Sequence, residues 1–141
     1  MQKRNLTLFA LFLSMTMFGC QPKPVLIDLS GIEKINSVEL SSDGAISNSP
    51  IKLTNEFIVN KWKNYLIKIN HGWERPWDTF PTPKYTVSLN ENGSYKFAVY
   101  SGLDYVWVGV RKGDQSSAMH RLSAEESNEL KDLVKESKTG H

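Results

Sequence analysis

The stretch that decides the fold is residues 84–111, with the sequence KYTVSLNENGSYKFAVYSGLDYVWVGVR. At its start, single polar residues separate Tyr85, Val87 and Leu89. This period of two is typical of a half-buried β-strand. Two short segments rich in turn residues then divide the stretch, so it predicts three antiparallel strands joined by hairpins.

The two predicted turns define a register for these strands. Residues 91–93 (ENG) form a candidate three-residue loop, because Gly93 can adopt the left-handed conformation that such a loop requires. The pairs that this loop predicts are Leu89 with Tyr95, Val87 with Phe97 and Tyr85 with Val99. A second loop at residues 101–104 (SGLD) predicts the pairs Tyr100 with Tyr105, Val99 with Val106, Phe97 with Val108 and Tyr95 with Val110. Both loops place apolar residues on one face, and a slip of one residue would move them all to the other face.

The composition indicates one domain without a strongly charged surface. The chain has 141 residues, of which 40% are apolar, enough for the core of a single domain. Seventeen Lys and Arg residues oppose fifteen Asp and Glu residues. Lys3 and Arg4 lie in a segment that we expect to be removed, which leaves fifteen of each sign. A nucleic-acid-binding protein usually carries a concentrated basic face, so this balance argues against that class.

The N-terminus has the pattern of a secretory signal. Lys3 and Arg4 precede an uncharged and mostly apolar run, Leu6–Phe18. Its thirteen residues are too few to cross a bilayer, which takes about 20. A basic segment followed by a short apolar run indicates a signal peptide rather than a transmembrane helix.

The end of this run, Met17–Cys20 (MFGC), resembles the lipobox of bacterial lipoproteins. Gly19 and Cys20 match that pattern, whereas Met17 and Phe18 differ from the usual Leu and Ala or Ser. The resemblance implies cleavage before Cys20, a lipid on its sulfur and, because Gln21 rather than Asp follows, the periplasmic face of the outer membrane. The alternative is that Cys20 is an incidental residue of the leader. It is the only cysteine, so no intramolecular disulfide can form.

These features divide the chain into three parts. We expect a lipoprotein signal peptide at residues 1–19, the lipidated Cys20 and a tether at 20–31, and a single α+β domain at 32–141. Pro22 and Pro24 favour an extended conformation in the tether.

Two amphipathic helices flank the strands. Thr54 is a suitable N-cap for the first, and Gly72 marks its end. Its apolar residues recur at helical spacing and comprise Ile58, Trp62, Tyr65, Leu66 and Ile69. This stripe fits either a lipid-facing surface or, as we prefer, packing on the sheet. Ser123 and Glu126 form a capping box for the second helix, whose apolar face contains Leu130, Leu133 and Val134.

The order of elements predicts the architecture. Ile35–Leu40, with Val38 and Leu40 buried, and Ala118–Leu122 are candidate additional strands. Consecutive strands with short turns and helices outside them indicate an α+β fold. We therefore expect an antiparallel sheet of about four to five strands. The two helices should pack on one face, which bears Val87, Phe97 and Val108.

The search for catalytic chemistry is negative. His71, His120 and His141 are far apart in the sequence without metal-ligand spacing, and phosphate-loop, dinucleotide and nucleophile-elbow motifs are absent from the sequence. Glu74 and Asp78 offer an acid–base pair near His71, but ordinary ion pairs in a solvated loop explain them as well. The sequence therefore predicts a protein that is not an enzyme and has no cofactor and no metal.

Aromatic residues supply the candidate interaction surface. The loop Trp73–Pro83 contains three prolines, which exclude a regular helix or central strand. If Val87 and Val108 face the helices, alternation places part of the aromatic set on the opposite face. The candidate interaction residues are Trp77, Phe80, Tyr100, Tyr105 and Trp107. Such a surface suits protein or glycan partners. The alternative is that the loop folds over this face and forms a second small core.

Two functions follow from these expectations. The first is a membrane-anchored envelope lipoprotein that acts as a non-catalytic binding module, such as an envelope factor, an inhibitor or an immunity-type protein. The second is a small hydrolase or glycan-binding domain that uses the Trp/Pro-rich loop. In either case the partners are the membrane, through the lipid anchor, and a protein or glycan.

Overall fold

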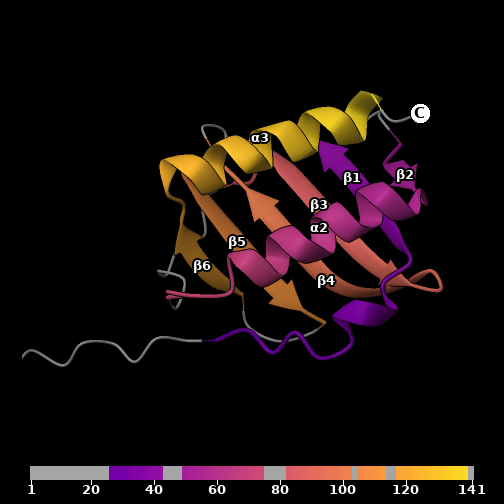
Figure 1. Cartoon of the computed structure of the whole chain (residues 1–141), viewed down its shortest axis with the longest axis horizontal. Coiled ribbons are helices and arrows are strands. Elements are labelled where there is room, and N and C mark those ends of the chain that lie inside the picture. Colours follow the sequence, from indigo (N-terminus) through magenta and orange to yellow (C-terminus); the bar gives the residue numbers. More distant parts are fainter. Residues whose placement is uncertain (1–25, 43–48, 75–81, 103–104, 114–116, 140–141) are drawn as a thin grey trace, which may run out of the picture.

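The computed structural model describes residues 26–42, 49–74, 82–102, 105–113 and 117–139 (Figure 1). The elements in chain order are η1 (Ile32–Lys34), β1 (Ser37–Ser42), β2 (Ile51–Leu53), α2 (Glu56–Lys68), β3 (Tyr85–Glu91), β4 (Ser94–Ser101), β5 (Trp107–Lys112), β6 (Ala118–Arg121) and α3 (Ala124–Thr139). None of the described helices is both long enough and apolar enough to cross a membrane.

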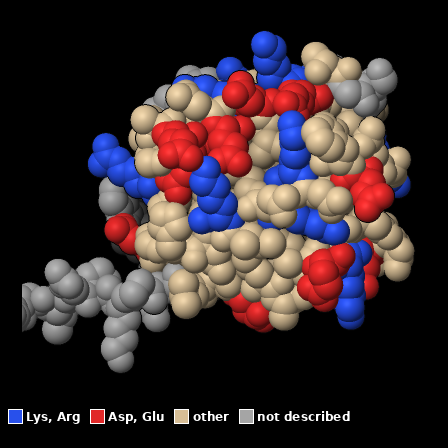
Figure 2. Space-filling model, in the orientation of Figure 1, with Lys and Arg blue, Asp and Glu red and all other residues tan. Residues whose placement is uncertain are grey.

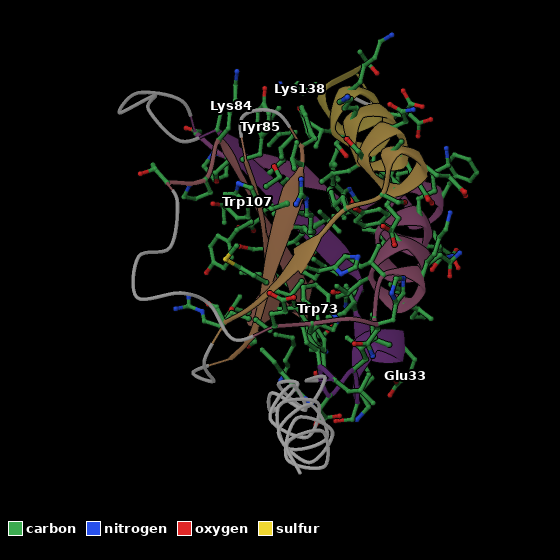
Figure 3. The ribbon with its side chains drawn as sticks, turned by 90° about the vertical axis from the view of Figure 1, so that its left-hand side faces the viewer. Glu33, Trp73, Lys84, Tyr85, Trp107 and Lys138 are labelled. Atoms are coloured by element: carbon green, nitrogen blue, oxygen red, sulfur yellow. The ribbon has the colours of Figure 1, made fainter. Side chains whose placement is uncertain are left out.

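The described strands form one antiparallel sheet of six strands in the order β2-β1-β3-β4-β5-β6. Both helices lie on the same side of this sheet, as the side view in Figure 3 shows. The predicted α+β class and the two helices on one face are confirmed, and the sheet has more strands than the four to five expected. The strand β2 was not predicted, because its three residues are too few to show a period.

The core lies between the helices and the sheet. Val87, Phe97 and Val108 are buried on the sheet face toward the helices, as predicted. The predicted stripe of the first helix is also buried, so it packs on the core and does not face lipid. Asn55, rather than Thr54, is the N-cap of α2, and its side chain accepts a hydrogen bond from the backbone N–H of Phe57.

Polar contacts join α2 to α3 at the surface and in the core. The buried Trp62 donates a hydrogen bond from Nε1 to Oγ of Ser137, over 3.0 Å. At the surface, Lys61 pairs with Glu136, and Lys68 pairs with both Glu125 and Glu129. Figure 2 shows the result: side chains of both signs are interspersed over the helices. This side of the molecule therefore carries no concentrated basic face.

The first hairpin differs from the prediction because its turn is shorter. Asn92 and Gly93 both have positive φ, of 50° and 78°, and Glu91 pairs directly with Ser94. This is the pattern of a two-residue hairpin turn, for which Asn-Gly is the preferred sequence. A bulge at Lys96 then shifts the register. The observed pairs are Asn90 with Tyr95, Leu89 with Phe97, Val87 with Val99 and Tyr85 with Ser101, so the predicted pairs were wrong by two residues.

The second hairpin differs because its loop is longer. The observed pairs are Phe97 with Lys112, Val99 with Val110, Tyr100 with Gly109 and Ser101 with Val108, a displacement of four residues from the prediction. The strand β5 begins at Trp107, so Tyr105 and Val106 belong to the loop. Val106 was expected to be buried but is 39% exposed. Tyr105 has a positive φ of 58°, which interrupts the alternation on which the prediction depended.

The N-terminal described segment is attached to the domain at several points. Ile27 and Leu29 pack against the core. The backbone N–H of Ile27 donates to Oδ1 of Asn70, and Nδ2 of Asn70 donates back to the carbonyl of Ile27. Lys112 at the end of β5 pairs with Asp28. Residues 26–30 are thus joined to Asn70, which follows α2, and to β5.

Candidate functional site

The face of the sheet that neither described helix covers, here called the open face, is built from large residues opposite small ones. On β4 and β5, Ala98 pairs with Arg111 and Tyr100 pairs with Gly109. Further along, the backbone N–H of Gly102 lies 3.5 Å from the carbonyl of Trp107. A Cβ added to Gly102 would come within 2.7 Å of Cε2 of Trp107, so the indole lies directly against this glycine. Each small residue makes room for a large neighbour.

A shallow groove of about 300 Å³ crosses the open face. Its lining consists mostly of hydroxyl, amide and charged side chains: Glu39, Thr86, Ser88, Asn90, Gly93, Tyr95, Ala98, Tyr100 and Arg111. The guanidinium carbon of Arg111 lies 5.7 Å from the ring centre of Tyr95 and 6.0 Å from that of Tyr100. In addition, Nε of Arg111 donates to the Tyr95 hydroxyl over 3.3 Å. Arginine and tyrosine thus form one side of the groove.

The structure brings together two of the five predicted aromatic residues on this face. Tyr100 lines the groove, and Trp107 stands on the same face of β5; both are half-buried. Because of the bulge at Lys96, Tyr95 also lies on the open face, whereas the prediction had placed it in the core. Trp77 and Phe80 lie outside the described residues, as does the predicted lipidation site Cys20. The alternative in which the loop at residues 73–83 folds over this face depends on residues 75–81, which also lie outside the described residues.

Tyr105 does not belong to the open face, which corrects the prediction. Its ring stacks on Tyr85 with a centroid distance of 5.9 Å, and Lys131 of α3 lies 5.9 Å from its ring centre. It packs on the helix-facing core, and this burial raises its pKa to about 12. Figure 3 shows the neighbouring Tyr85 beside Lys138 of α3, which donates a hydrogen bond to the Tyr85 hydroxyl over 3.0 Å.

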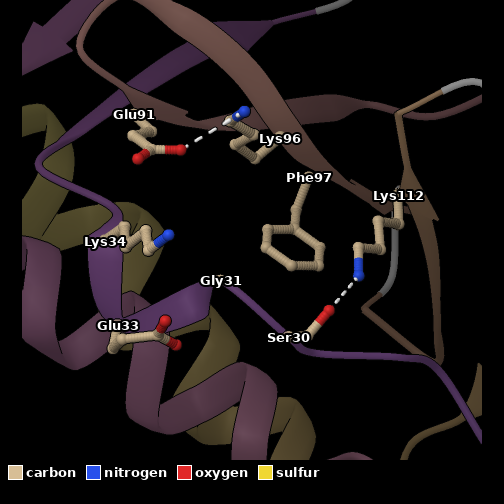
Figure 4. A pocket seen from close by; sticks show the side chains of 8 residues that line it. All are labelled: Ser30, Gly31, Glu33, Lys34, Glu91, Lys96, Phe97 and Lys112. Atoms are coloured by element: carbon tan, nitrogen blue, oxygen red, sulfur yellow. Dashed lines mark hydrogen bonds and ion pairs between the residues drawn. The ribbon is translucent and has the colours of Figure 1, made fainter.

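A second cavity, of about 490 Å³, lies beside the N-terminal segment (Figure 4). Its lining residues are Ser30, Gly31, Glu33, Lys34, Glu91, Lys96, Phe97 and Lys112. Lys96 pairs with Glu91 over 3.2 Å, and Lys112 donates to the Ser30 hydroxyl and pairs with Asp28. Two of the three lysines are therefore engaged with acidic residues, which leaves the cavity little net positive charge to attract an anion.

A third group of polar residues lies where α2 ends and α3 begins. His71 follows α2, His120 is in β6, and Glu126 is in the first turn of α3. The carboxylate of Glu126 contacts both imidazoles: Oε1 lies 3.0 Å from Nε2 of His71, and Oε2 lies 3.4 Å from Nε2 of His120. The two imidazole rings meet edge to face with a centroid distance of 4.9 Å.

Several groups hold Glu126 and His120 in place. The backbone N–H of Ser123 donates to Oε2 of Glu126 over 2.7 Å, and the Ser123 hydroxyl accepts from the Glu126 backbone N–H, as the predicted capping box requires. Burial raises the pKa of the Glu126 carboxyl. The hydrogen bonds from Ser123 and His120 outweigh that effect, so the pKa lies below its ordinary value. Trp73 packs on His120 with ring centres 5.4 Å apart.

The sequence prediction missed this cluster, because it considered histidine spacing along the chain. His71 and Glu126 are 55 positions apart, and only antiparallel packing brings the end of α2 next to the start of α3. Of the acid–base pair considered near His71, Glu74 forms a backbone bridge to Met119, and Asp78 lies outside the described residues. The capping-box position of Glu126 was the one available signal that its carboxylate is fixed.

Comparison of the chain with known proteins found no matching family model, no curated protein of significant similarity and no matching solved structure.

Proposed function

We propose that this protein is a membrane-anchored lipoprotein of the bacterial cell envelope that binds a protein partner through the open face of its sheet. The residues that would make contact are Tyr95, Tyr100, Trp107 and Arg111. In this proposal the domain is a non-catalytic binding module, and the lipid on Cys20 holds it at the periplasmic face of the outer membrane.

One observation carries the proposal: both described helices cover the same face of the sheet, and tyrosine, tryptophan and arginine gather on the other. These residue types are the ones most enriched in the energetic centres of protein interfaces. On the helix side, Figure 2 shows basic and acidic side chains interspersed over the described helices. The open face is therefore the better candidate for recognition.

The shape of the groove favours a protein over a small substrate. Small-molecule sites are usually concave, with mostly apolar walls, whereas this groove is shallow and mostly polar. Its hydroxyl and amide groups, beside two tyrosine rings, also fit a glycan. Glycan binding is thus the second candidate, favoured by this lining.

The predicted anchor would keep the domain close to the membrane. Six residues separate Cys20 from Ile27, the first of the described residues that packs on the core. A chain of this length reaches at most about 25 Å when fully extended. A bound partner would then be held near the membrane surface.

The partner is tested by site-specific photocrosslinking in intact cells. The full-length chain carries p-benzoylphenylalanine in place of Tyr100, and a matched chain carries it in place of Phe57, an aromatic residue of α2 that is 64% exposed. We expect a discrete protein adduct, identified by mass spectrometry, from position 100 and not from position 57. The purified partner should bind the wild-type chain, and the variants Tyr100→Ala and Trp107→Ala should lose binding while keeping a cooperative thermal transition.

Other results would contradict this proposal. Equal crosslinking from both positions would remove the open face as the specific site. Cosedimentation with purified peptidoglycan that Tyr100→Ala abolishes, without any protein adduct, would replace the protein partner with a glycan.

The anchor is tested separately with Cys20→Ser. We expect this substitution to release the protein from the membrane fraction or to leave an uncut precursor, because the thioether-forming sulfur is lost. A Cys20→Ser chain that is still cleaved and still sediments with membranes would exclude the lipobox interpretation without affecting the proposed binding face.

A further inference from the structure

The cluster of His71, His120 and Glu126 offers three ligand atoms from three separate elements. One nitrogen of each imidazole and one carboxylate oxygen all lie within 4.8 Å of one another. Two of the three residues are buried, with His120 and Glu126 each 7% exposed, while the side chain of His71 is 62% exposed. The cluster is therefore fixed on its inner side and open to solvent on its outer side.

The two shortest contacts within the cluster are similar in length to the distance between two ligands of a single small ion. Zinc–nitrogen and zinc–oxygen bonds of about 2.0–2.1 Å at tetrahedral angles place the ligand atoms about 3.3 Å apart. The nitrogen–oxygen distances in the cluster are 3.0 Å, from His71 to Oε1 of Glu126, and 3.4 Å, from His120 to Oε2, and all three ligand atoms lie within 4.8 Å of one another. We propose that His71, His120 and Glu126 bind one divalent transition-metal ion, for which Zn²⁺ is the best match to the ligand set.

The chemistry of the ligands supports a transition metal over calcium or magnesium. Imidazole nitrogen suits zinc, copper, iron and nickel, whereas calcium and magnesium prefer sites made of oxygen atoms. Two imidazoles and one carboxylate are also a set that zinc uses in proteins, with a water molecule as the fourth ligand. The exposure of His71 leaves room on the solvent side for that water.

The surroundings hold the inner ligands ready for an ion. Glu126 is fixed by the two hydrogen bonds of the capping box, which join its carboxylate and its backbone N–H to Ser123. The backbone at Gly72 passes close to His120, since a Cβ there would lie 3.6 Å from Nδ1. Trp73 closes the other side and is itself held by a hydrogen bond from Nε1 to Asn70.

The competing interpretation is a hydrogen-bonded cluster that merely joins α2, β6 and α3. Both interpretations predict some loss of stability when a member is removed, so stability does not separate them. A direct measurement of metal binding separates the two interpretations, because a purely structural network would not bind an ion.

The test is a titration of ZnCl₂ into the full-length protein, purified in detergent without a histidine tag and freed of metal with a chelator. Isothermal calorimetry gives the stoichiometry and affinity, and Co²⁺ serves as a spectroscopic probe of the ligand field. The variants are His71→Ala, at an exposed position, and Glu126→Gln, which keeps a side chain able to complete the capping box. Glu125→Gln is the matched control, because Glu125 is in the same turn of α3 but is 81% exposed and pairs with Lys68.

We expect one Zn²⁺ per chain, with affinity lowered at least about tenfold in His71→Ala and Glu126→Gln and unchanged in Glu125→Gln. The Co²⁺-loaded wild type should show the visible absorption of a four- or five-coordinate site, and both ligand variants should lose it. Absence of stoichiometric Zn²⁺ binding by the wild type would overturn the proposal. So would an affinity that is the same in the wild type and all three variants.

Discussion

At the scale of single residues, side-chain direction in the central hairpin decides which residues form the core and which form the open face. Phe97 is fully buried, whereas its neighbour Lys96 occupies the bulge and pairs with Glu91 at the surface. Because of the bulge, Tyr95 and Phe97 lie on opposite faces of the sheet, and Tyr95 lies beside Arg111. One extra residue in β4 thus adds an aromatic ring to the open face.

Because Phe97 is buried and Lys96 lies at the surface, replacing each with alanine should change the free energy of unfolding by very different amounts. Phe97→Ala should lower the free energy of unfolding by about 3–5 kcal/mol, because it removes a buried aromatic ring and leaves a cavity. Lys96→Ala should change it by no more than about 1 kcal/mol, since an exposed ion pair contributes little. Urea denaturation of both variants measures the difference, and similar losses in the two would contradict the assigned faces.

At the scale of elements, α2 and α3 are joined in the core by a hydrogen bond between two buried side chains. Both Trp62 and Ser137 are fully buried, and the hydrogen bond between them lies between the two helices. Because bulk water cannot reach the indole N–H, this group needs a hydrogen-bond acceptor from the protein. The Ser137 hydroxyl is that partner.

The predicted consequence is a coupling between the two helices. Ser137→Ala should lower the free energy of unfolding by about 1–3 kcal/mol, because it leaves the Trp62 N–H buried without its acceptor. Phenylalanine has no such N–H. In a Trp62→Phe background, Ser137→Ala should therefore lower the free energy of unfolding much less. A double-mutant cycle by chemical denaturation provides the coupling energy, and additive effects would show that the hydrogen bond contributes nothing measurable.

At the scale of the whole molecule, residues 26–30, the described part of the predicted tether, are attached to the domain and so affect how the domain would be presented at a membrane. Asp28 is central to this attachment. The hydrogen bond from Lys112 lowers the pKa of its carboxyl most, the backbone and hydroxyl of Ser30 lower it further, and the resulting pKa is about 2.

This attachment predicts a pH dependence with a definite sign. The folded-state pKa of Asp28 is below its ordinary value of 3.8, so the ion pair stabilises the attachment above that pH and is lost as the pH falls through about 2. Lys112→Met should raise the pKa of Asp28 part of the way toward 3.8, since Ser30 still donates. An NMR titration of the carboxyl carbon measures this shift. Lys96→Met is the control, and an equal shift there would contradict the assignment to Lys112.

The sequence by itself was sufficient for the fold class and for the face on which most strand residues lie. Side chains on a strand alternate with a period of two, so an error of two or four residues in register leaves Val87, Phe97 and Val108 on the same face. The helices and the capping box were predictable for a similar reason, because both depend on residues close together in the chain.

Only the tertiary structure decided the details on which the two proposed sites depend. The bulge at Lys96 and the left-handed Tyr105 each interrupt the alternation, so Tyr95 joins the open face and Tyr105 leaves it. The meeting of His71 with Glu126 depends on antiparallel helix packing, which no local pattern encodes. Local periodicity determines which way a side chain points within one element, whereas contacts between distant elements are determined by how the whole core packs.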